Sequence, residues 1–258
     1  MCKSPNRKLL GSCSDRQIAR YLADPVIFSC EQLLWTPDEQ QMEILSAPNS
    51  RIALNWARQT GKSSVLAAKA AHMLILRPET VVLIVADRMA HVEETVYKMD
   101  RLFAALNIRT RNEAGKKLSR VLPNHSRVIS LAADEGAVRS FTAHMVIIDE
   151  AARVPPEVWD SIEPTLATTN GPLFICGTPE GCRGPFWEIC VKPGPEWLVS
   201  RRTIHECPRI AKEFIELQRR TKGEQMFKQE YECQFVESGR HLLGRPDIER
   251  ILDNTEPM

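Results

Sequence analysis

Short apolar segments that alternate with helical patterns place the strongest limit on the fold of this 258-residue chain. Such segments occur at residues 51–56, 80–86, 145–148 and 173–176, and residues 118–132 read as two strands around a turn at Asn124. A strand that is buried on both faces appears as a continuous apolar run, and helices between such strands give parallel connections. The pattern predicts an α/β fold with a mainly parallel central sheet and helices on both faces.

Helical patterns occupy the intervals between these segments. Residues 63–76 are rich in alanine and leucine, and apolar residues recur every three or four positions between Val92 and Leu106. Thr36-Pro37-Asp38-Glu39 has the pattern of a capping box with Thr36 as the N-cap, which predicts a helix that carries Gln40 and Gln41 in its first turns. Further helical patterns lie near 211–220 and 225–234.

These patterns divide the chain into three parts. Residues 1–35 form a mixed lead-in, residues 36–208 form the main α/β unit, and residues 209–258 form a small C-terminal helical extension. A chain of this length can bury one full core, so we expect one main folding unit.

The composition excludes a strongly cationic protein. The chain has 34 lysines and arginines against 33 aspartates and glutamates, so any contact with nucleic acid must come from local patches. Its eight cysteines include no C-x-x-C pair, which argues against a structural metal site. The N-terminus lacks the apolar core of a signal peptide, and no apolar run is long enough to span a bilayer. We therefore expect a soluble cytosolic protein with reduced thiols.

The first motif with chemical meaning is Gly61-Lys62-Ser63, between a predicted strand and a predicted helix. In that context the loop N–H groups and the helix N-terminus point at the same anion. Lys62 would reach the β- and γ-phosphates of a nucleotide, and the Ser63 hydroxyl would bind Mg²⁺. The usual phosphate loop has glycine where this chain has Trp56, so the entry to the loop differs. The alternative is a helix start with an exposed lysine.

The second motif is the apolar segment Met145 to Ile148, which ends in Asp149 and Glu150. Its position at the carboxyl edge of the sheet would let Asp149 hold the magnesium shell beside the γ-phosphate. Glu150 would then act as a general base that orients the attacking water. Alternatively, the two acids only cap the following helix. The separation from the phosphate loop leaves room for an intervening strand and helix, and both are predicted.

The third motif is Cys176-Gly-Thr178-Pro-Glu-Gly181, directly after a buried strand. The hydroxyl of Thr178 would lie at the sheet edge beside the γ-phosphate and could sense whether that group is present. Gly-Thr-Pro is also common in ordinary turns, and this interpretation stays open.

Taken together, these segments resemble the ATPase domain of the large terminase subunit, the motor that packs DNA into the capsids of tailed phages and herpesviruses. That family typically dispenses with the first glycine of the loop and carries Arg-Gln before a variable residue and Gly-Lys, as in Arg58-Gln59-Thr60-Gly61-Lys62-Ser63. Further matches are Gln41, Ala137-Val-Arg139, Ile162-Glu-Pro164, Thr178-Pro-Glu-Gly181 and Gln229-Glu-Tyr231. The resemblance spans residues 36–237 and implies a P-loop ATPase fold of the RecA-like ASCE type.

The resemblance implies ATP and Mg²⁺ as ligands and assigns roles to named residues. Gln41 would read the adenine edge, with Gln40 as the alternative in register. The remaining nucleotide contacts would be Arg58, Gln59, Thr60, Gly61, Lys62, Ser63, Ser64 and Thr178, and the metal would be held at Ser63 and Asp149. Arg58 would contact phosphates and couple to movement, and Thr178 matches the coupling position.

Arg139 matches the arginine considered a finger, which would complete the site of a neighbouring subunit beside Lys62, Arg58 and Glu150 of that subunit. The alternative is a surface arginine or a local partner of a helix terminus.

The resemblance also implies partners, namely double-stranded DNA, the portal protein and procapsid, and the small terminase subunit. The active form would be a homo-oligomeric ring in the host cytoplasm, with no membrane contact, and the isolated chain would be a sluggish monomer. Complete members carry a nuclease domain after the ATPase, and the last residues of this chain resemble the connecting segment before it. We therefore expect ATP hydrolysis without DNA cleavage.

Cationic clusters are the candidate DNA contacts. The main one lies within residues 107–120, and smaller ones are Arg201-Arg202 and Arg219-Arg220-Lys222. The cations of the main cluster are Arg109, Arg111, Lys116, Lys117 and Arg120, against Glu113. Such groups bind phosphates without sequence preference, which suits a motor, but a charged run is more often a solvated surface.

Three other functions stay open. A helicase-like DNA-dependent ATPase shares these motifs but normally has a second similar domain. A nucleotide-binding assembly factor would bind ATP without hydrolysing it. A metabolite kinase fits least, since no arginine-rich lid follows the sheet and Glu150 suits water activation.

Overall fold

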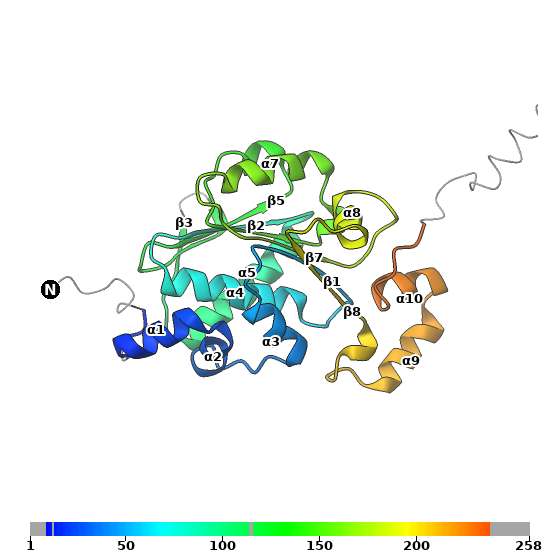
Figure 1. Cartoon of the computed structure of the whole chain (residues 1–258), viewed down its shortest axis with the longest axis horizontal. Coiled ribbons are helices and arrows are strands. Elements are labelled where there is room, and N and C mark those ends of the chain that lie inside the picture. Colours follow the sequence, from blue (N-terminus) through cyan, green and yellow to red (C-terminus); the bar gives the residue numbers. More distant parts are fainter. Residues whose placement is uncertain (1–8, 12, 114–115, 238–258) are drawn as a thin grey trace, which may run out of the picture.

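An eight-stranded sheet forms the centre of the computed structural model, which describes residues 9–11, 13–113 and 116–237 (Figure 1). Its strand order is β3-β4-β5-β2-β6-β7-β1-β8. The strands are β1 (Arg51–Trp56), β2 (Val81–Ala86), β3 (Arg111–Glu113), β4 (Lys116–Val121), β5 (Arg127–Ala132), β6 (Met145–Asp149), β7 (Leu173–Gly177) and β8 (Trp197–Arg202). All neighbours pair in parallel except β3 with β4 and β4 with β5. The predicted α/β fold with a mainly parallel sheet is confirmed.

Helices cover both faces of this sheet (Figure 1). On one face lie α1 (Asp15–Ala23), α2 (Pro25–Glu31), α3 (Glu39–Ser46), α4 (Lys62–Leu76) and α5 (Met89–Ala105). The other face carries α6 (Glu135–Val138), α7 (Pro156–Leu166) and α8 (Pro185–Val191). Because both faces are covered, strands such as β2 and β6 are buried along their whole length, which explains their uninterrupted apolar sequences.

The lead-in packs closely on the main unit. Tyr21 of α1 and Phe28 of α2 are buried in the same core cluster as α4. His72 of α4 lies with its Nε2 atom 2.7 Å from the carbonyl oxygen of Tyr21. Burial in this layer lowers the pKa of the His72 imidazole. The first helices therefore belong physically to the α4 face of the sheet.

The predicted start of α3 was wrong by two residues. Asp38 is the N-cap instead of Thr36, and its carboxylate accepts a hydrogen bond from the N–H of Gln41 at 3.1 Å. The amide oxygen of Gln41 accepts in return from the Asp38 N–H at 3.0 Å. A capping box therefore exists, but it uses the next possible pair of residues. The consequence is that Gln41 is a capping residue as well as a candidate ligand.

The C-terminal part contains a strand that the apolar pattern did not predict. Strand β8 lies at the edge of the sheet, where half-buried polar residues give it no continuous apolar run. The short 3₁₀ helix Ile204–Glu206, α9 (Lys212–Thr221) and α10 (Glu224–Glu230) follow it. These elements form a third cluster with Ala57, Ile215 and Phe227, beside the end of β1 (Figure 1). The extension is thus anchored at the entrance to the loop after β1.

Within the described residues, no helix is long and apolar enough to cross a membrane.

Buried Lys69 gives the first prediction. Its Nζ donates to the carbonyl oxygens of Ile44, Leu45 and Ala47 at 2.8, 3.1 and 3.1 Å, at the end of α3. Burial lowers its pKa from 10.5 to about 8. Between these two pH values the unfolded chain holds a proton that the folded chain has lost, so the free energy of unfolding rises with pH, by up to about 3 kcal/mol.

Urea denaturation between about pH 7.5 and 10.5 checks this, with Lys69→Met as the reference that cannot titrate. The wild-type chain is expected to gain stability relative to Lys69→Met as the pH rises. A difference between the two that does not change with pH contradicts the prediction.

Candidate nucleotide site

The loop between β1 and α4 has the backbone of an anion cradle. Gln59 and Gly61 have positive φ angles of 60° and 94°, and α4 begins at Lys62. A side chain at position 61 would also meet Gln41, because a Cβ there would lie 2.3 Å from its Nε2. Glycine is therefore required both for the left-handed turn and for the close approach of Gln41. The turn brings the loop to the N-terminus of α4, where unpaired N–H groups favour an anion.

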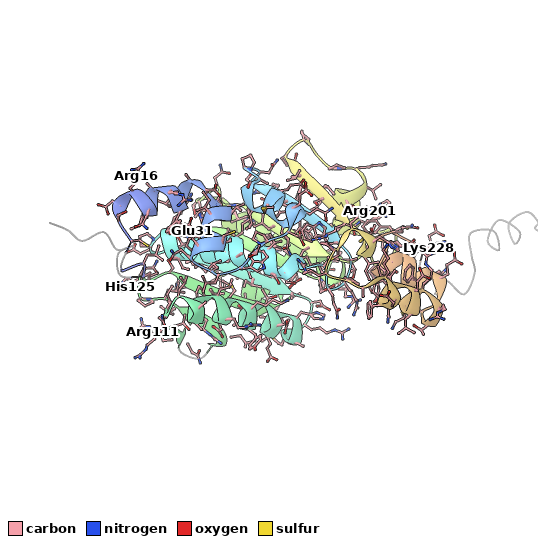
Figure 2. All side chains as sticks on the ribbon, turned by 90° about the horizontal axis from the view of Figure 1, so that it is seen from below. Arg16, Glu31, Arg111, His125, Arg201 and Lys228 are labelled. Atoms are coloured by element: carbon pink, nitrogen blue, oxygen red, sulfur yellow. The ribbon has the colours of Figure 1, made fainter. Side chains whose placement is uncertain are left out.

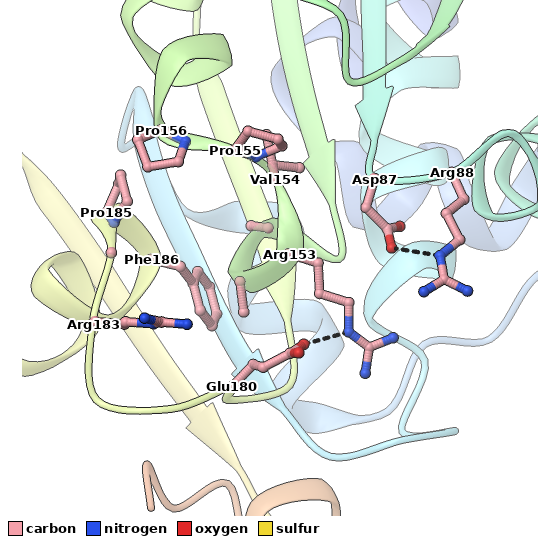
Figure 3. A pocket seen from close by; sticks show the side chains of 13 residues that line it. Asp87, Arg88, Arg153, Val154, Pro155, Pro156, Glu180, Arg183, Pro185 and Phe186 are labelled. Atoms are coloured by element: carbon pink, nitrogen blue, oxygen red, sulfur yellow. Dashed lines mark hydrogen bonds and ion pairs between the residues drawn. The ribbon is translucent and has the colours of Figure 1, made fainter. Parts of the chain in front are cut away.

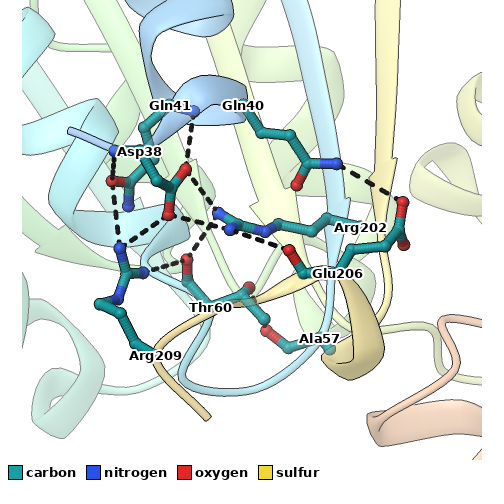
Figure 4. Close-up of polar contacts among 8 residues, drawn as sticks. All are labelled: Asp38, Gln40, Gln41, Ala57, Thr60, Arg202, Glu206 and Arg209. Atoms are coloured by element: carbon teal, nitrogen blue, oxygen red, sulfur yellow. Dashed lines mark hydrogen bonds and ion pairs between the residues drawn. The ribbon is translucent and has the colours of Figure 1, made fainter.

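Two arginines hold this loop from behind (Figure 4). The carbonyl oxygen of Thr60 accepts hydrogen bonds from Arg202 at 3.2 Å and from Arg209 at 3.0 Å. The hydroxyl of Thr60 donates to the carbonyl oxygen of Ala57 at 2.7 Å, inside the loop. Thr60 is fully buried, so it supports the loop from beneath.

Both arginines converge on Asp38 at the start of α3 (Figure 4). Arg202 binds both carboxylate oxygens, at 3.1 and 2.8 Å, and Arg209 binds one of them at 2.7 Å. Burial alone would raise the pKa of the Asp38 carboxyl. The hydrogen bonds from Arg202 and Gln41 and the two positive charges outweigh it and hold that pKa below its usual value.

Trp56 has a structural role where other phosphate loops have glycine. Its indole is fully buried, and its N–H donates to the Ser200 hydroxyl at 3.0 Å. The guanidinium of Arg202 lies over the ring, 5.1 Å from its centroid. Arg202 is itself only 1% exposed. The tryptophan therefore forms one wall of the site that holds the loop-binding arginine.

Arg58 connects the loop to the C-terminal extension. Its N–H donates to the carbonyl oxygen of Glu230 at 3.1 Å, and its guanidinium forms an ion pair with the Glu230 carboxylate at 2.9 Å. Glu230 lies within the Gln229-Glu-Tyr231 match. Arg58 is half exposed, so its side chain can also reach a ligand above the loop.

Two acids face the loop from the carboxyl end of β6. Glu150 lies 3.7 Å from Nζ of Lys62 and has a positive φ of 50°, which turns the chain sharply after the strand. Asp149 is buried and accepts hydrogen bonds from the Thr95 hydroxyl at 2.7 Å and the Cys176 thiol at 3.1 Å. Burial raises the pKa of the Cys176 thiol far above its usual value, and the charge of Asp149 acts in the same direction. Cys176 therefore stays a thiol that can donate to Asp149.

The donor set fits a magnesium ion of the kind that accompanies nucleotides. Such an ion takes one or two protein oxygens and completes its shell with water and phosphate oxygens. Ser63, in the first turn of α4, and Asp149 supply oxygens of that type. Among the described residues no cluster of three metal-binding side chains is present, which suits an ion that arrives with its nucleotide.

The predicted residues surround one pocket of about 350 Å³. From the predicted set, its lining includes Arg58, Gln59, Gly61, Lys62, Ser63, Ser64, Asp149 and Glu150. Gln41 and Thr60 lie behind the loop, where Gln41 contacts Gly61. Gln40 points instead toward Glu206, 3.5 Å from its carboxylate (Figure 4). The loop and the acids, about 85 residues apart in the chain, therefore meet as the motifs predicted.

Thr178 lies one residue beyond β7 and is buried. Its neighbour Gly177 packs closely under the acidic turn, since a Cβ at that position would lie 3.2 Å from the N atom of Ala151. The third motif thus touches the segment that follows Glu150, as its place at the sheet edge requires.

A second pocket, of about 830 Å³, lies on the far side of Arg153 (Figure 3). Arg153 lines both pockets and forms an ion pair with Glu180 at 2.5 Å. Asp87 and Arg88 border the second pocket from the end of β2. No phosphate-loop residue lines it, so its larger volume does not make it the nucleotide site.

Comparison with known proteins gives the family. Residues 53–181, half of the chain, match the family model for the helicase domain of RNA cytidine acetyltransferase NAT10/TcmA, which places the chain in that helicase-like family. The large terminase subunit of Thermus virus P23-45 is 30% identical over 172 residues, which cover 58% of this chain and 35% of that protein. The large terminase subunit of Escherichia phage T5 is 29% identical over 216 residues, covering 78% and 48%. The chain belongs with the ATPase domains of phage large terminases.

Solved terminase structures share the fold. The large terminase ATPase domain of Thermus phage P74-26 superposes with a TM-score of 0.74 at 22% identity and covers 83% of this chain and 99% of its own. The HK97 bacteriophage large terminase gives a TM-score of 0.60 at 15% identity, covering 85% and 55%. The predicted RecA-like P-loop fold is confirmed. The chain spans less than half the length of the curated terminases that it matches.

Arg139 of this terminase-type domain lies away from the nucleotide pocket. It is exposed, and its Nε donates to the Ser161 hydroxyl of α7 at 3.0 Å. It is not among the residues that line the pocket of its own chain. Its placement is compatible with a finger for another copy and equally with the local alternative.

Two of the candidate DNA contacts bind acids within the protein. Including Arg202 was wrong, because it is buried on Asp38. Arg120 binds Asp100 at 2.8 Å. Arg111 is exposed on edge strand β3, at the end of the molecule opposite Lys228 (Figure 2). The side chains of Lys116 and Lys117 lie outside the described part of the structure.

The motifs did not identify four residues of the site. His91, Glu94 and Lys98 of α5 and Arg153 line the nucleotide pocket. The three α5 residues are spaced by three and four positions, so they share one helix face. That face could have been found from the sequence, but only with knowledge that α5 packs beside α4.

Proposed function

We propose that this domain hydrolyses MgATP and that the energy drives double-stranded DNA into a viral procapsid. One observation carries the proposal, namely that the loop before α4 and the acids after β6 face each other in one pocket. That arrangement suits a terminal phosphate between Lys62 and Glu150. The large terminase of a thermophilic bacteriophage, which has the same fold, has been solved in complex with ADP and with ATP-γ-S, in agreement with a nucleotide at this place.

In the proposed reaction, a water molecule attacks the γ-phosphorus in line with the leaving group. A bond forms from the water oxygen to phosphorus while the bond to the β,γ-bridging oxygen breaks, and ADP leaves with that electron pair. The carboxylate of Glu150 takes the proton from the water. Lys62 holds the β- and γ-phosphates, and Arg58 contacts them from the loop. Magnesium, held by Ser63 and Asp149, would neutralise charge on the phosphates.

Other predicted contacts act at the ends of the nucleotide. Gln41 would meet the adenine edge from behind Gly61, with Gln40 as the alternative, and Thr178 would respond to the terminal phosphate. The loop residues Gln59, Thr60, Gly61 and Ser64 would shape the cradle. Each of these roles stays a prediction.

The active form proposed is a ring of copies in the host cytoplasm that engages DNA, the portal protein of the procapsid and the small terminase subunit. Arg139 would enter the site of a neighbouring copy. That the chain does not cut DNA also stays a prediction.

A mixing experiment tests the shared site. Arg139→Ala and Glu150→Gln are each expected to lower ATP turnover by about 10³-fold or more. In a mixed ring, a copy with intact Glu150 can receive Arg139 from its neighbour, so turnover should recover above that of either protein alone. The measurement is phosphate release against protein concentration.

The control is the Arg139→Ala/Glu150→Gln double variant, which can restore only half of each site. It should not rescue Arg139→Ala. If no mixture of the single variants recovers activity while the wild type is active, Arg139 does not act between copies.

A helicase-like DNA-dependent ATPase is the second candidate, and the match to a helicase domain favours it. Unwinding of a forked duplex would support it. ATP turnover that rises with an empty procapsid, without unwinding, would support the packaging motor.

A further inference from the structure

The nucleotide pocket holds an imidazole for which the proposed reaction has no role. His91 lies in the first turn of α5 and lines the pocket together with Lys62 and Glu150. It reaches the pocket from the end of β2, and Asp149 on the adjacent strand β6 is held by Thr95 of the same helix. His91 therefore stands across the pocket from the phosphate loop.

Asp87 fixes the orientation of this ring. The Nδ1 atom of His91 lies 2.5 Å from the Asp87 carboxylate, whose side chain is only 7% exposed. A carboxylate can only accept a hydrogen bond, so Nδ1 carries a proton and donates it. Among the described residues no partner is found for the second ring nitrogen, Nε2, which leaves it available to a ligand.

The other donors of the pocket are tied to acids. Arg58 binds Glu230, Arg153 binds Glu180, and Lys98 binds Glu94 at 3.4 Å. Lys62 faces Glu150. The charged groups that surround His91 are Asp87, Arg88, Arg58, Lys62, Glu94, Lys98, Asp149, Glu150 and Arg153. A terminal phosphate entering this pocket therefore meets few donors without an existing partner.

We infer that His91, oriented by Asp87, donates a hydrogen bond from Nε2 to the terminal phosphate and so distinguishes ATP from ADP. An imidazolium between two anions carries a proton on both nitrogens, and Asp87 and the phosphate supply those anions. His91 thus contacts the substrate, and Asp87 is a positioning residue. This inference rests on the proposed ATPase function.

Nucleotide affinity tests the inference without relying on turnover. Hydrogen bonds to charged groups are strong, so His91→Ala is expected to weaken a hydrolysis-resistant ATP analogue by about 10- to 100-fold. Affinity for ADP, which lacks the terminal phosphate, should stay within about two-fold of wild type. His91→Gln keeps an N–H donor and should lie between wild type and His91→Ala, as should Asp87→Asn.

Glu93→Ala is the matched control, because it places alanine in the same turn of α5 at an exposed position outside the pocket. It should change neither affinity. Equal losses for both nucleotides in His91→Ala, or no loss for either, overturn the inference. A wild-type chain that binds neither nucleotide overturns the proposed function itself, and this assignment falls with it.

Discussion

Glu150→Gln is expected to lower the rate of ATP hydrolysis by about 10³-fold, because an amide cannot take the proton of the attacking water. Glutamine has nearly the same shape, and Lys62 and the loop remain in place, so the affinity for ATP should change little. The two quantities are phosphate release at saturating ATP and the dissociation constant of a fluorescent ATP analogue.

Glu163→Gln is the control, since Glu163 is an exposed acid that pairs with Arg51 away from the pocket. It should leave turnover unchanged. If Glu150→Gln hydrolyses ATP as fast as wild type, Glu150 is not the base. Negligible turnover in both the wild type and the variant would favour an assembly factor that binds ATP without hydrolysing it.

Arg202→Met is expected to lower the free energy of unfolding by about 3 to 5 kcal/mol. The substitution removes both hydrogen bonds to Asp38, one bond to the Thr60 carbonyl and the cation over the Trp56 ring. It leaves the partly buried carboxylate of Asp38 with Arg209 as its remaining arginine partner. The loop loses a support at the same time, so ATP binding should weaken as well. Urea denaturation and nucleotide titration measure the two effects.

Arg209→Met provides a matched comparison within the same network. Arg209 binds the same carboxylate and the same carbonyl as Arg202, but its side chain is 47% exposed. Water screens such a pair, so this variant should lose less than about 1 kcal/mol. Equal losses from the two substitutions would contradict the role given to the burial of Arg202.

The sequence predicted the parts of the fold that continuous apolar runs define. Strands β1, β2, β6 and β7 are buried on both faces, so their residues are apolar throughout. Edge strand β8 escaped, because one of its faces meets solvent and its polar residues break the pattern. The start of α3 was misplaced because Thr36 and Asp38 are both good N-caps, and only the tertiary ion pairs of Asp38 decide between them.

The motifs identified the candidate site only where chemistry follows local sequence. Lys62 and Ser63 follow a strand directly, and Glu150 ends one, so their neighbours in the chain indicate their place. Arg202 and Glu230 reach the loop from about 140 and 170 residues away, and nothing local marks them. His91 was missed for the same reason, because its place in the pocket depends on how α5 packs.

The double attachment of the loop to Glu230 makes the catalytic centre mechanically continuous with the tail of the domain. One bond runs through the main chain of Arg58 and one through its side chain, and neither passes through the sheet. A load applied beyond residue 237 would therefore strain the phosphate cradle before it disturbed the core. By the same route, a change of ligand in the cradle would shift whatever the tail is fastened to.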